Sequence, residues 1–311
     1  MKNITKIDKD FKKILIIGAN GFLGSRFLQL KKNEEIKHHN FQFIAADVKN
    51  SNIPLDTEFF YIDITQPKDT LKKIEKISPD IILLTAAMTN VDQNEVDKKL
   101  SILINTEGSK NVLKACKKIG SKLIFMSTDF IFDGISKEGN YNEEDIPNPL
   151  NHYGKTKLDA ERAITNSEIE YIICRTAVLY GWNNEKQNFI TWIINKLQHH
   201  EPIQIVTDQL NSPTLVNNLA EILLKLIEKD VNGIYHTAGD CILNRHEMAL
   251  NCAEVFHLDK DLISQIESIQ QKAVRPKNVG LDISKLKKLI GSELKIYNLK
   301  EGLNYMKENR L

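Results

Sequence analysis

The sequence lacks a bias of charge, and this absence limits the partners that it can attract. Its 311 residues include 42 lysines and arginines against 41 aspartates and glutamates, which leaves a formal net charge of +1. Proteins that bind nucleic acid or an anionic membrane through surface charge normally have a strong basic excess. We therefore expect no nucleic acid and no membrane among its partners.

Long apolar runs and closely spaced cysteines are missing too. No run approaches the roughly 20 apolar residues that span a bilayer, and segment 1–13 is too charged for the apolar core of a signal peptide. The cysteines have no C-x-x-C spacing, so we expect reduced and mostly buried thiols in a soluble, cytoplasmic protein. They are Cys116, Cys174, Cys241 and Cys252.

Metal ligands are scarce as well. Two pairs of adjacent histidines, His38–His39 and His199–His200, stand in polar segments. Adjacent histidines in such surroundings are more typical of a solvated surface than of a metal site. We predict no metal.

What the sequence does contain is an alternation of short apolar runs with amphipathic stretches. Runs that are apolar throughout indicate strands buried on both faces, and the stretches between them indicate helices. The expected strands cover 13–17, 41–47, 59–63, 80–85, 122–126 and 171–175, and the expected helices cover 22–30, 69–77 and 92–119, the last with a break near Lys99. This order predicts an α/β fold with a Rossmann-type doubly wound parallel sheet.

The pattern loosens after about residue 180. We expect helices at 188–199, 215–229, 244–257 and 297–308, with short strands near 203–206 and 233–236. The sequence therefore predicts a Rossmann domain over residues 1–180. A smaller substrate-binding lobe would cover residues 181–311, with some of its chain returning to the sheet.

A glycine-rich turn, G-A-N-G-F-L-G, follows the first expected strand and opens the first expected helix. The first glycine permits a tight turn, the second lets backbone N–H groups approach a pyrophosphate, and the third lets the helix pack on the strand. The partial positive charge of the helix N-terminus favours phosphate there. A glycine triplet alone fits any tight turn, but its strand–turn–helix context predicts binding of NAD or NADP. The residues concerned are Gly18, Asn20, Gly21, Phe22, Leu23 and Gly24.

Asp47 ends the second expected strand, where a carboxylate can accept hydrogen bonds from the ribose hydroxyls of adenosine. Its charge would repel a 2′-phosphate, so NADH is slightly favoured over NADPH. Lys49, two residues further on, would weaken that preference. A role for Asp47 as a turn-former stays open.

Two further strand ends fit the same cofactor. Asp63 and Ile64 follow the third strand, a position that would flank the adenine. Thr85, Ala86 and Ala87 end the fourth strand with small side chains, which let a ligand lie close to the backbone.

Tyr153 and Lys157 stand four residues apart at the start of an expected helix, so they share one face. An isolated tyrosine has a pKa of about 10, but a nearby ammonium and an oxidised nicotinamide ring would favour the phenolate. The pair alone also fits an ordinary amphipathic helix. Together with the glycine-rich turn and with Thr128 at the end of the fifth strand, it predicts reductase chemistry. Thr128 would hold the substrate oxygen, Tyr153 would pass it a proton, and Lys157 would bind the cofactor ribose.

Four more polar residues each leave two interpretations open. Asn105 would either anchor a hydrogen-bond network near Lys157 or face solvent. Asp92 and Glu95 would line the substrate mouth or cap the helix that they begin. Arg275 would pair with a nucleotide diphosphate or lie on the surface before a proline-fixed turn.

Several segments resemble the extended short-chain dehydrogenases/reductases, and within them the dTDP-4-dehydrorhamnose reductases. The likeness runs from about Lys13 to Leu303. Besides the glycine-rich turn, the matching segments are A-A-D-V, T-A-A-M-T-N-V-D-Q-N-E, S-T-D-F-I-F-D-G, Y-G-K-T-K-L, R-T-A-V-L-Y-G, T-D-Q-L-N-S-P-T, G-I-Y-H-T-A-G and R-P-K-N-V-G-L-D.

The resemblance implies reduction of a nucleotide-linked 4-keto-6-deoxysugar at C4 by NADH or NADPH, with dTDP-4-dehydro-L-rhamnose as the first candidate. Its catalytic set falls on Thr128, Tyr153 and Lys157. Its sugar contacts would include Thr128 and Asp129, with Val178 where the family often has a tryptophan. Its cofactor positions fall on Gly21, Phe22, Leu23, Asp47, Asp63, Ile64, Ala87, Met88, Thr89 and Met126.

Related enzymes leave alternatives. Sugar-nucleotide dehydratases place an Asp-Glu pair after the threonine, whereas this chain has Asp129 and then Phe130, which cannot abstract a proton. The valine at position 178 leaves the particular sugar open, so another keto-deoxysugar is a second candidate. A third is a non-catalytic NADP-binding subunit like the regulatory subunit of methionine adenosyltransferase, although the intact Thr-Tyr-Lys set argues against it. A homodimer also stays open.

Overall fold

The computed structural model describes residues 11–32, 41–51, 53–135, 140–183, 186–268 and 271–310. At its centre is a seven-stranded sheet with the order β12-β7-β5-β4-β1-β2-β3, in which every neighbouring pair is parallel. The prediction of an α/β fold with a doubly wound parallel sheet is confirmed. The strands are β1 Lys12–Ile17, β2 Phe41–Asp47, β3 Phe59–Tyr61, β4 Ile81–Leu84, β5 Lys122–Thr128, β7 Tyr171–Thr176 and β12 Gly233–His236.

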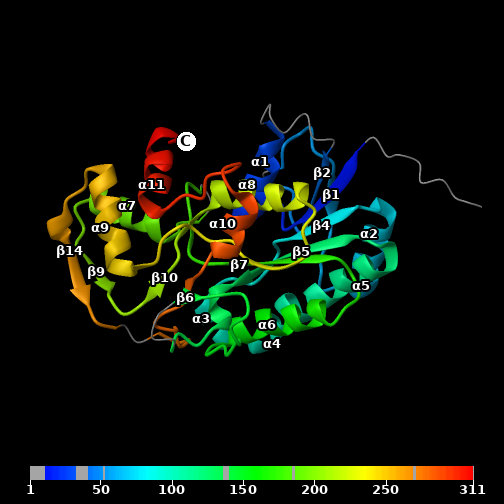
Figure 1. Cartoon of the computed structure of the whole chain (residues 1–311), viewed down its shortest axis with the longest axis horizontal. Coiled ribbons are helices and arrows are strands. Elements are labelled where there is room, and N and C mark those ends of the chain that lie inside the picture. The colour runs from blue at the N-terminus through cyan, green and yellow to red at the C-terminus, as the bar shows by residue number, and fades with distance from the viewer. Residues whose placement is uncertain are drawn as a thin grey trace, which may run out of the picture.

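Helices cover both faces of this sheet, which is why its inner strands are apolar throughout (Figure 1). One face packs against α1 Phe22–Gln29, α8 Val216–Glu228 and α10 Ser284–Ile290. The other packs against α2 Pro67–Ile77, α5 Ser109–Ile119 and α6 His152–Thr165. The direction in which the sheet is extended changes between β1 and β4, because β2 lies on one side of β1 and β4 lies on the other. The carboxyl ends of β1 and β4 therefore form the crevice where such sheets bind ligands.

The long helix expected over 92–119 is divided. Its parts are α3 Val91–Val96, α4 Lys98–Ser101, a π-helical segment Ile102–Gly108, and α5. The break that we expected near Lys99 falls at Asp97, whose side chain accepts a hydrogen bond from the backbone N–H of Leu100. Asp97 therefore marks the end of α3, and its carboxylate caps the start of α4.

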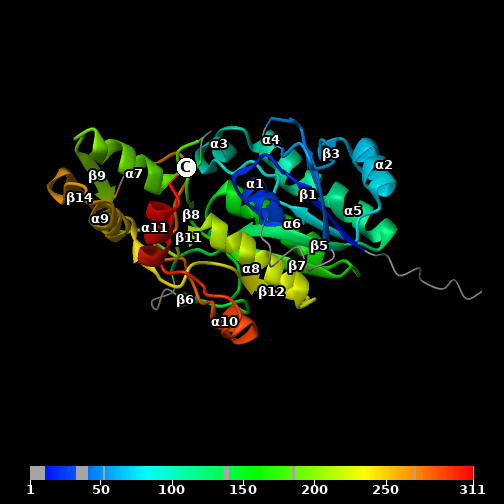
Figure 2. The same cartoon turned by 90° about the horizontal axis from the view of Figure 1, so that it is seen from above.

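A third apolar core forms the smaller lobe at one end of the molecule (Figure 1 and Figure 2). Its elements are α7 Phe189–Gln198, β9 Ile203–Val206, α9 Arg245–Phe256, β14 Ile263–Ile266 and α11 Leu299–Glu308. Between these segments the chain passes back through α8 and β12, which belong to the sheet and its covering layer. The position of a domain boundary near residue 180 stays a prediction.

Very short elements escape prediction from the sequence. They are the two-residue strands β6 Asn140–Tyr141, β8 Leu179–Tyr180, β10 Leu210–Asn211, β11 Thr214–Leu215, β13 Leu243–Asn244 and β15 Gly280–Leu281, the helix α10, and the 3-10 turns Leu30–Lys32, Asp129–Ile131 and Lys260–Leu262. Two residues are too few for a periodic pattern, so only the tertiary structure defines these pairings.

The cysteines are free of disulfides, as expected: three are buried and Cys241 is partly buried. In the described part of the chain, no helix combines the length and the apolar character needed to cross a bilayer. His38 and His39 lie outside the described residues, and His199 and His200 are exposed at the end of α7. Within the described ranges no three His, Cys, Asp or Glu side chains gather as a metal site would require.

Candidate active site

The glycine-rich turn holds β1, β4 and α1 in backbone contact. Gly18 has φ of 95°, and a Cβ there would lie 2.5 Å from the backbone nitrogen of Ala86. A Cβ on Gly24 would lie 2.2 Å from the carbonyl oxygen of Gly18. Helix α1 begins after Gly21 without any side-chain cap, so its N-terminal N–H groups face the crevice with no side chain bound to them. This arrangement suits a phosphate.

Asp47 ties this turn to the end of β2. Its Oδ2 accepts a hydrogen bond of 2.9 Å from the backbone nitrogen of Asn20, and its Oδ1 accepts one of 2.7 Å from that of Val48. The side chain of Asn20 in turn donates to the carbonyl of Lys49. Asp47 therefore shapes the turn, and its role toward a ribose stays a prediction.

The other predicted cofactor positions lie around the same strand ends. Oδ1 of Asp63 accepts hydrogen bonds from the backbone and the hydroxyl of Thr65, and Ile64 is buried against the π-helical segment. Ala86, Ala87 and Met88 are half-buried after β4, and Thr89 is exposed. Met126 is buried within β5, in the core that contains α1.

Asn105 links the segment after β4 to α6. It is fully buried, its Oδ1 accepts from the backbone nitrogen of Met88 at 2.8 Å, and its Nδ2 donates to the hydroxyl of Thr156 at 3.2 Å and to Oδ1 of Asn94 at 3.1 Å. The alternative that Asn105 faces solvent is wrong. The π-helical turn that contains it is a local irregularity of a kind that is frequent at functional sites.

Thr128 and Tyr153 meet where β5 ends and α6 begins. The hydroxyl of Thr128 accepts from the backbone nitrogen of Phe130 at 3.2 Å and donates to Oδ1 of Asp129 at 3.0 Å. A Cβ on Gly154 would lie 2.1 Å from the carbonyl oxygen of Phe130. The glycine after the tyrosine is thus needed for the first turn of α6 to approach the end of β5.

Lys157 lies one turn further along α6 and is only 3% exposed. Its Nζ is 4.0 Å from the centroid of the Phe125 ring, and the described residues supply no hydrogen bond or ion pair to it. Burial lowers the pKa of Lys157 to about 7, and the charge of Glu161 opposes this change. A buried ammonium with so perturbed a pKa is typical of a functional site.

Burial also raises the pKa of Tyr153, the charge of Asp129 raises it further, and the hydrogen bond with Thr128 lowers it. The net direction is opposite to the one expected from a nearby ammonium and an oxidised nicotinamide. That expectation concerns the complex with oxidised cofactor and stays a prediction.

Asp129 is buried directly after β5. Its Oδ2 accepts a hydrogen bond of 3.0 Å from Nδ2 of Asn211 in β10. Burial raises the pKa of Asp129 to about 6, against the hydrogen bonds from Thr128 and Asn211 and the charge of Arg245. Both oxygens of Asp129 are bonded to the protein, and its expected contact with the sugar stays a prediction. Asn211 and Arg245 were not predicted as site residues, although Asn211 lies in the T-D-Q-L-N-S-P-T segment.

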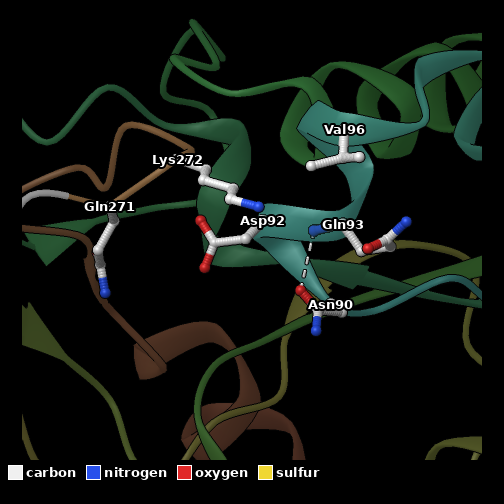
Figure 3. A pocket seen from close by; sticks show the side chains of 6 residues that line it. All are labelled: Asn90, Asp92, Gln93, Val96, Gln271 and Lys272. Carbon is white, nitrogen blue, oxygen red and sulfur yellow. Dashed lines mark hydrogen bonds between the residues drawn. The ribbon is translucent and has the colours of Figure 1, made fainter.

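Arg275 makes a bidentate ion pair with Asp92, at 2.9 and 3.2 Å. Oε1 of Glu95 accepts from the backbone nitrogen of His152. Asp92 also lines a cavity of about 420 Å³ between α3 and the segment around Lys272 (Figure 3). The cap of α3 is the side chain of Asn90, so neither carboxylate is the cap. A contact of Arg275 with a diphosphate stays a prediction.

Val178 has a backbone φ of 42°, which is unfavourable for a β-branched residue. It lies between β7 and β8, is partly buried, and its carbonyl accepts from the backbone nitrogen of Thr214. Strain of this kind persists only where the surrounding structure holds it, and it is often found at functional sites. Its contact with a sugar stays a prediction.

Comparison with known proteins identifies a matching family and several similar proteins. Residues 12–308 match the family model described as RmlD substrate binding domain. Methionine adenosyltransferase 2 subunit beta of Xenopus tropicalis is 30% identical over 287 residues, 89% of this chain and 82% of that protein.

Two solved structures are similar over nearly the whole chain. A dTDP-4-dehydrorhamnose reductase from Clostridium acetobutylicum has a TM-score of 0.84 with 30% identity, covering 96% of this chain and 99% of its own. The dTDP-4-dehydrorhamnose reductase from Bacillus anthracis, solved in complex with NADP, has a TM-score of 0.84 with 29% identity and the same coverage.

Proposed function

The chain belongs to the RmlD substrate binding domain family, that of the dTDP-4-dehydrorhamnose reductases, and we propose that it reduces a nucleotide-linked 4-keto-6-deoxysugar with NADH or NADPH. The first candidate is the conversion of dTDP-4-dehydro-L-rhamnose to dTDP-L-rhamnose, a step of polysaccharide biosynthesis in the cytoplasm. The observation that carries the proposal is the meeting of Thr128, Tyr153 and Lys157 at the carboxyl end of the sheet.

The residues at this edge fit a nicotinamide dinucleotide. The glycine turn and the uncapped start of α1 suit the pyrophosphate, and Asp47 lies where a ribose acceptor is expected. Ser127 and Thr176 have buried hydroxyls with no hydrogen-bond partner among the described residues, which is costly unless a ligand supplies one. Such a cofactor, when reduced, supplies the hydride.

The chain's own residues would then manage the proton. Thr128 would hold the carbonyl oxygen of the sugar, and Tyr153 would give that oxygen its phenolic proton as the carbon gains the hydride. Lys157 would bind the cofactor ribose and stabilise the phenolate that remains. Phe130 follows Asp129 with no acid or base function, so elimination of water is disfavoured.

The proposal is tested by incubating the purified protein with NADH or NADPH and a panel of dTDP- and UDP-linked 4-keto-6-deoxysugars. We expect oxidation of the cofactor with at least one dTDP-sugar, faster than with its UDP counterpart. If no member of the panel is reduced while cofactor still binds, the reductase proposal is contradicted. Reduction of a different keto-deoxysugar would keep the chemistry and change the substrate.

The likeness to methionine adenosyltransferase 2 subunit beta favours a second candidate, a non-catalytic subunit that binds NAD(P) and regulates another enzyme. Such a subunit would form a stoichiometric complex with a methionine adenosyltransferase and would reduce no keto-sugar. The complete Thr128, Tyr153 and Lys157 set supports the reductase instead, because a binding subunit has no need of a buried proton donor. Size-exclusion chromatography of the mixed proteins separates the two outcomes.

A further inference from the structure

The side chain of Asn151 joins two segments that lie far apart in the sequence. Asn151 is 0% exposed and is the N-cap of α6. Its Oδ1 accepts a hydrogen bond of 2.8 Å from the backbone nitrogen of Gly154, and its Nδ2 donates one of 3.0 Å to the carbonyl oxygen of Val274. One carboxamide thus holds both the first turn of α6, which contains Tyr153, and segment 273–275.

Segment 273–275 is bound to α3 as well. Oδ1 of Asp92 accepts a hydrogen bond of 2.9 Å from the backbone nitrogen of Ala273, and the Asp92 carboxylate makes the bidentate ion pair with Arg275. Lys272, the residue before this segment, lines the cavity of about 420 Å³ together with Asp92 (Figure 3). Two cations, Lys272 and Arg275, are therefore held next to the start of α6, and cations of this kind bind the phosphates of a nucleotide.

The two partners of Asn151 require opposite hydrogen-bonding groups. The backbone N–H of Gly154 needs an acceptor, and the carbonyl of Val274 needs a donor. A carboxamide supplies both from one side chain, whereas a carboxylate can only accept. The first turn of α6 is also fixed to the end of β5, because a Cβ on Gly154 would lie 2.1 Å from the carbonyl oxygen of Phe130. Asn151 therefore connects segment 273–275 to a rigid part of the molecule.

We propose that Asn151 is a positioning residue: its side chain fixes segment 273–275 relative to Tyr153, so that a sugar nucleotide bound by this segment presents its carbonyl to the phenol. The consequence for the sugar rests on the proposed function. The attachment of segment 273–275 to α6 is a property of the free protein and is measured without any ligand.

The first test is hydrogen–deuterium exchange, followed by mass spectrometry, on the free protein. Asn151→Asp keeps an oxygen to cap α6 but replaces the donor that faces the Val274 carbonyl by an acceptor. We expect the backbone amides of 273–275 to exchange about tenfold faster, the effect of losing one hydrogen bond, while those of 154–157 keep their wild-type rate. Asn151→Ser also keeps a capping oxygen without the amide donor, and it replaces the aspartate variant if that variant does not fold.

Asn188→Asp is the matched control, because Asn188 makes the same two kinds of bond elsewhere. Its Oδ1 caps α7 by accepting from the backbone nitrogen of Thr191, and its Nδ2 donates to the carbonyl oxygen of Gly181. This variant should leave exchange in 273–275 unchanged. Unchanged exchange in a folded Asn151 variant, or an equal acceleration in Asn188→Asp, would overturn the inference.

Steady-state kinetics separate positioning from a merely structural role. A purely structural defect lowers the fraction of folded enzyme, which reduces the apparent kcat and leaves KM as it is. In Asn151→Asp we expect the KM for the keto-sugar to rise about tenfold and kcat to change less. If the wild type turns over and the KM of this variant stays the same, the inference fails and the proposed function stands. If the wild type reduces no keto-sugar, the proposed function fails, and exchange alone decides whether Asn151 holds segment 273–275.

Discussion

Helix α6 buries two opposite charges one turn apart, and the protein treats them differently. Glu161 forms a bidentate ion pair with Arg175 of β7, with Nε–Oε1 and Nη2–Oε2 distances of 3.2 and 2.9 Å. Lys157 has no such partner among the described residues, and only the face of the Phe125 ring lies against its ammonium.

The two charges differ in what their burial costs. A buried charge that is paired and hydrogen-bonded recovers most of its desolvation cost, so the Glu161–Arg175 pair fastens α6 to the sheet. A buried charge without a partner keeps that cost, which is tolerated where the charge acts on a ligand. The comparison indicates a structural role for Glu161, and it supports the proposed chemical role of Lys157 one turn earlier in α6.

Removing the proton donor should have the largest effect. Tyr153→Phe keeps the ring and deletes the phenol, so keto-sugar turnover should fall by about 10²–10⁴-fold while cofactor affinity, measured by fluorescence titration, stays the same. Tyr171→Phe, at the opposite end of the sheet, is the control and should turn over normally. A Tyr153→Phe protein with the wild-type rate would contradict the proposed role of Tyr153 as proton donor.

Breaking the paired charge should damage stability instead of chemistry. Glu161→Gln leaves the buried Arg175 guanidinium without its counter-charge, and we expect the free energy of unfolding to drop by about 3–5 kcal/mol in urea titrations. Glu168→Gln breaks the exposed pair with Lys117 and should cost less than about 1 kcal/mol. Equal losses of stability in the two variants would show that burial does not determine how much the Glu161–Arg175 pair stabilises the protein.

Replacing the unpaired charge of Lys157 should instead abolish turnover and increase stability. Lys157→Met abolishes turnover yet should raise the free energy of unfolding by about 1–2 kcal/mol at pH 6, because a buried unpaired ammonium disappears. The folded pKa of Lys157 is about 7 against an ordinary value of 10.5. Between pH 7 and pH 10.5 the unfolded wild type binds more protons than the folded wild type, so the free energy of unfolding of the wild type rises with pH. The stability advantage of Lys157→Met over the wild type should therefore shrink across that range. A gain that is constant from pH 6 to pH 10 would contradict the lowered pKa.

The smallest effect is expected at the far end of the crevice. Asp47→Asn removes a charge that should disfavour the 2′-phosphate of NADPH while keeping an oxygen acceptor for the backbone nitrogen of Asn20. The ratio of the Kd for NADPH to the Kd for NADH should fall about tenfold, as expected for one charged contact. Lys49→Met, which removes the neighbouring cation, should change the ratio in the other direction. An unaltered ratio in both variants would limit Asp47 to shaping the turn.

The parts of the molecule that the sequence predicts are those with local patterns. The strands of the parallel sheet are apolar on both faces and long enough to be recognised, and the glycine-rich turn is confined to one segment. Tyr153 and Lys157 were predicted because four residues bring them to one face of a helix.

The remainder depends on contacts between distant segments. Asn211 reaches Asp129 from 82 residues further along the chain, through a strand of two residues. No periodicity reveals that contact, and the same holds for the ion pair of Arg275 with Asp92. The π-helical turn that aims Asn105 at Met88 is also invisible in the residue pattern, which only indicates a helix with a break.

The account depends most on the claim that Tyr153 and its neighbours transfer a proton while a hydride reaches the sugar. The direct measurement is a single-turnover reaction of the protein with cofactor carrying deuterium at nicotinamide C4 and with dTDP-4-dehydrorhamnose, followed by mass and NMR analysis of the sugar. We predict one deuterium at C4 of the product with the wild-type protein, and none within the same time with Tyr153→Phe. Deuterium that never reaches the sugar in the wild-type reaction, with both ligands bound, would contradict the account.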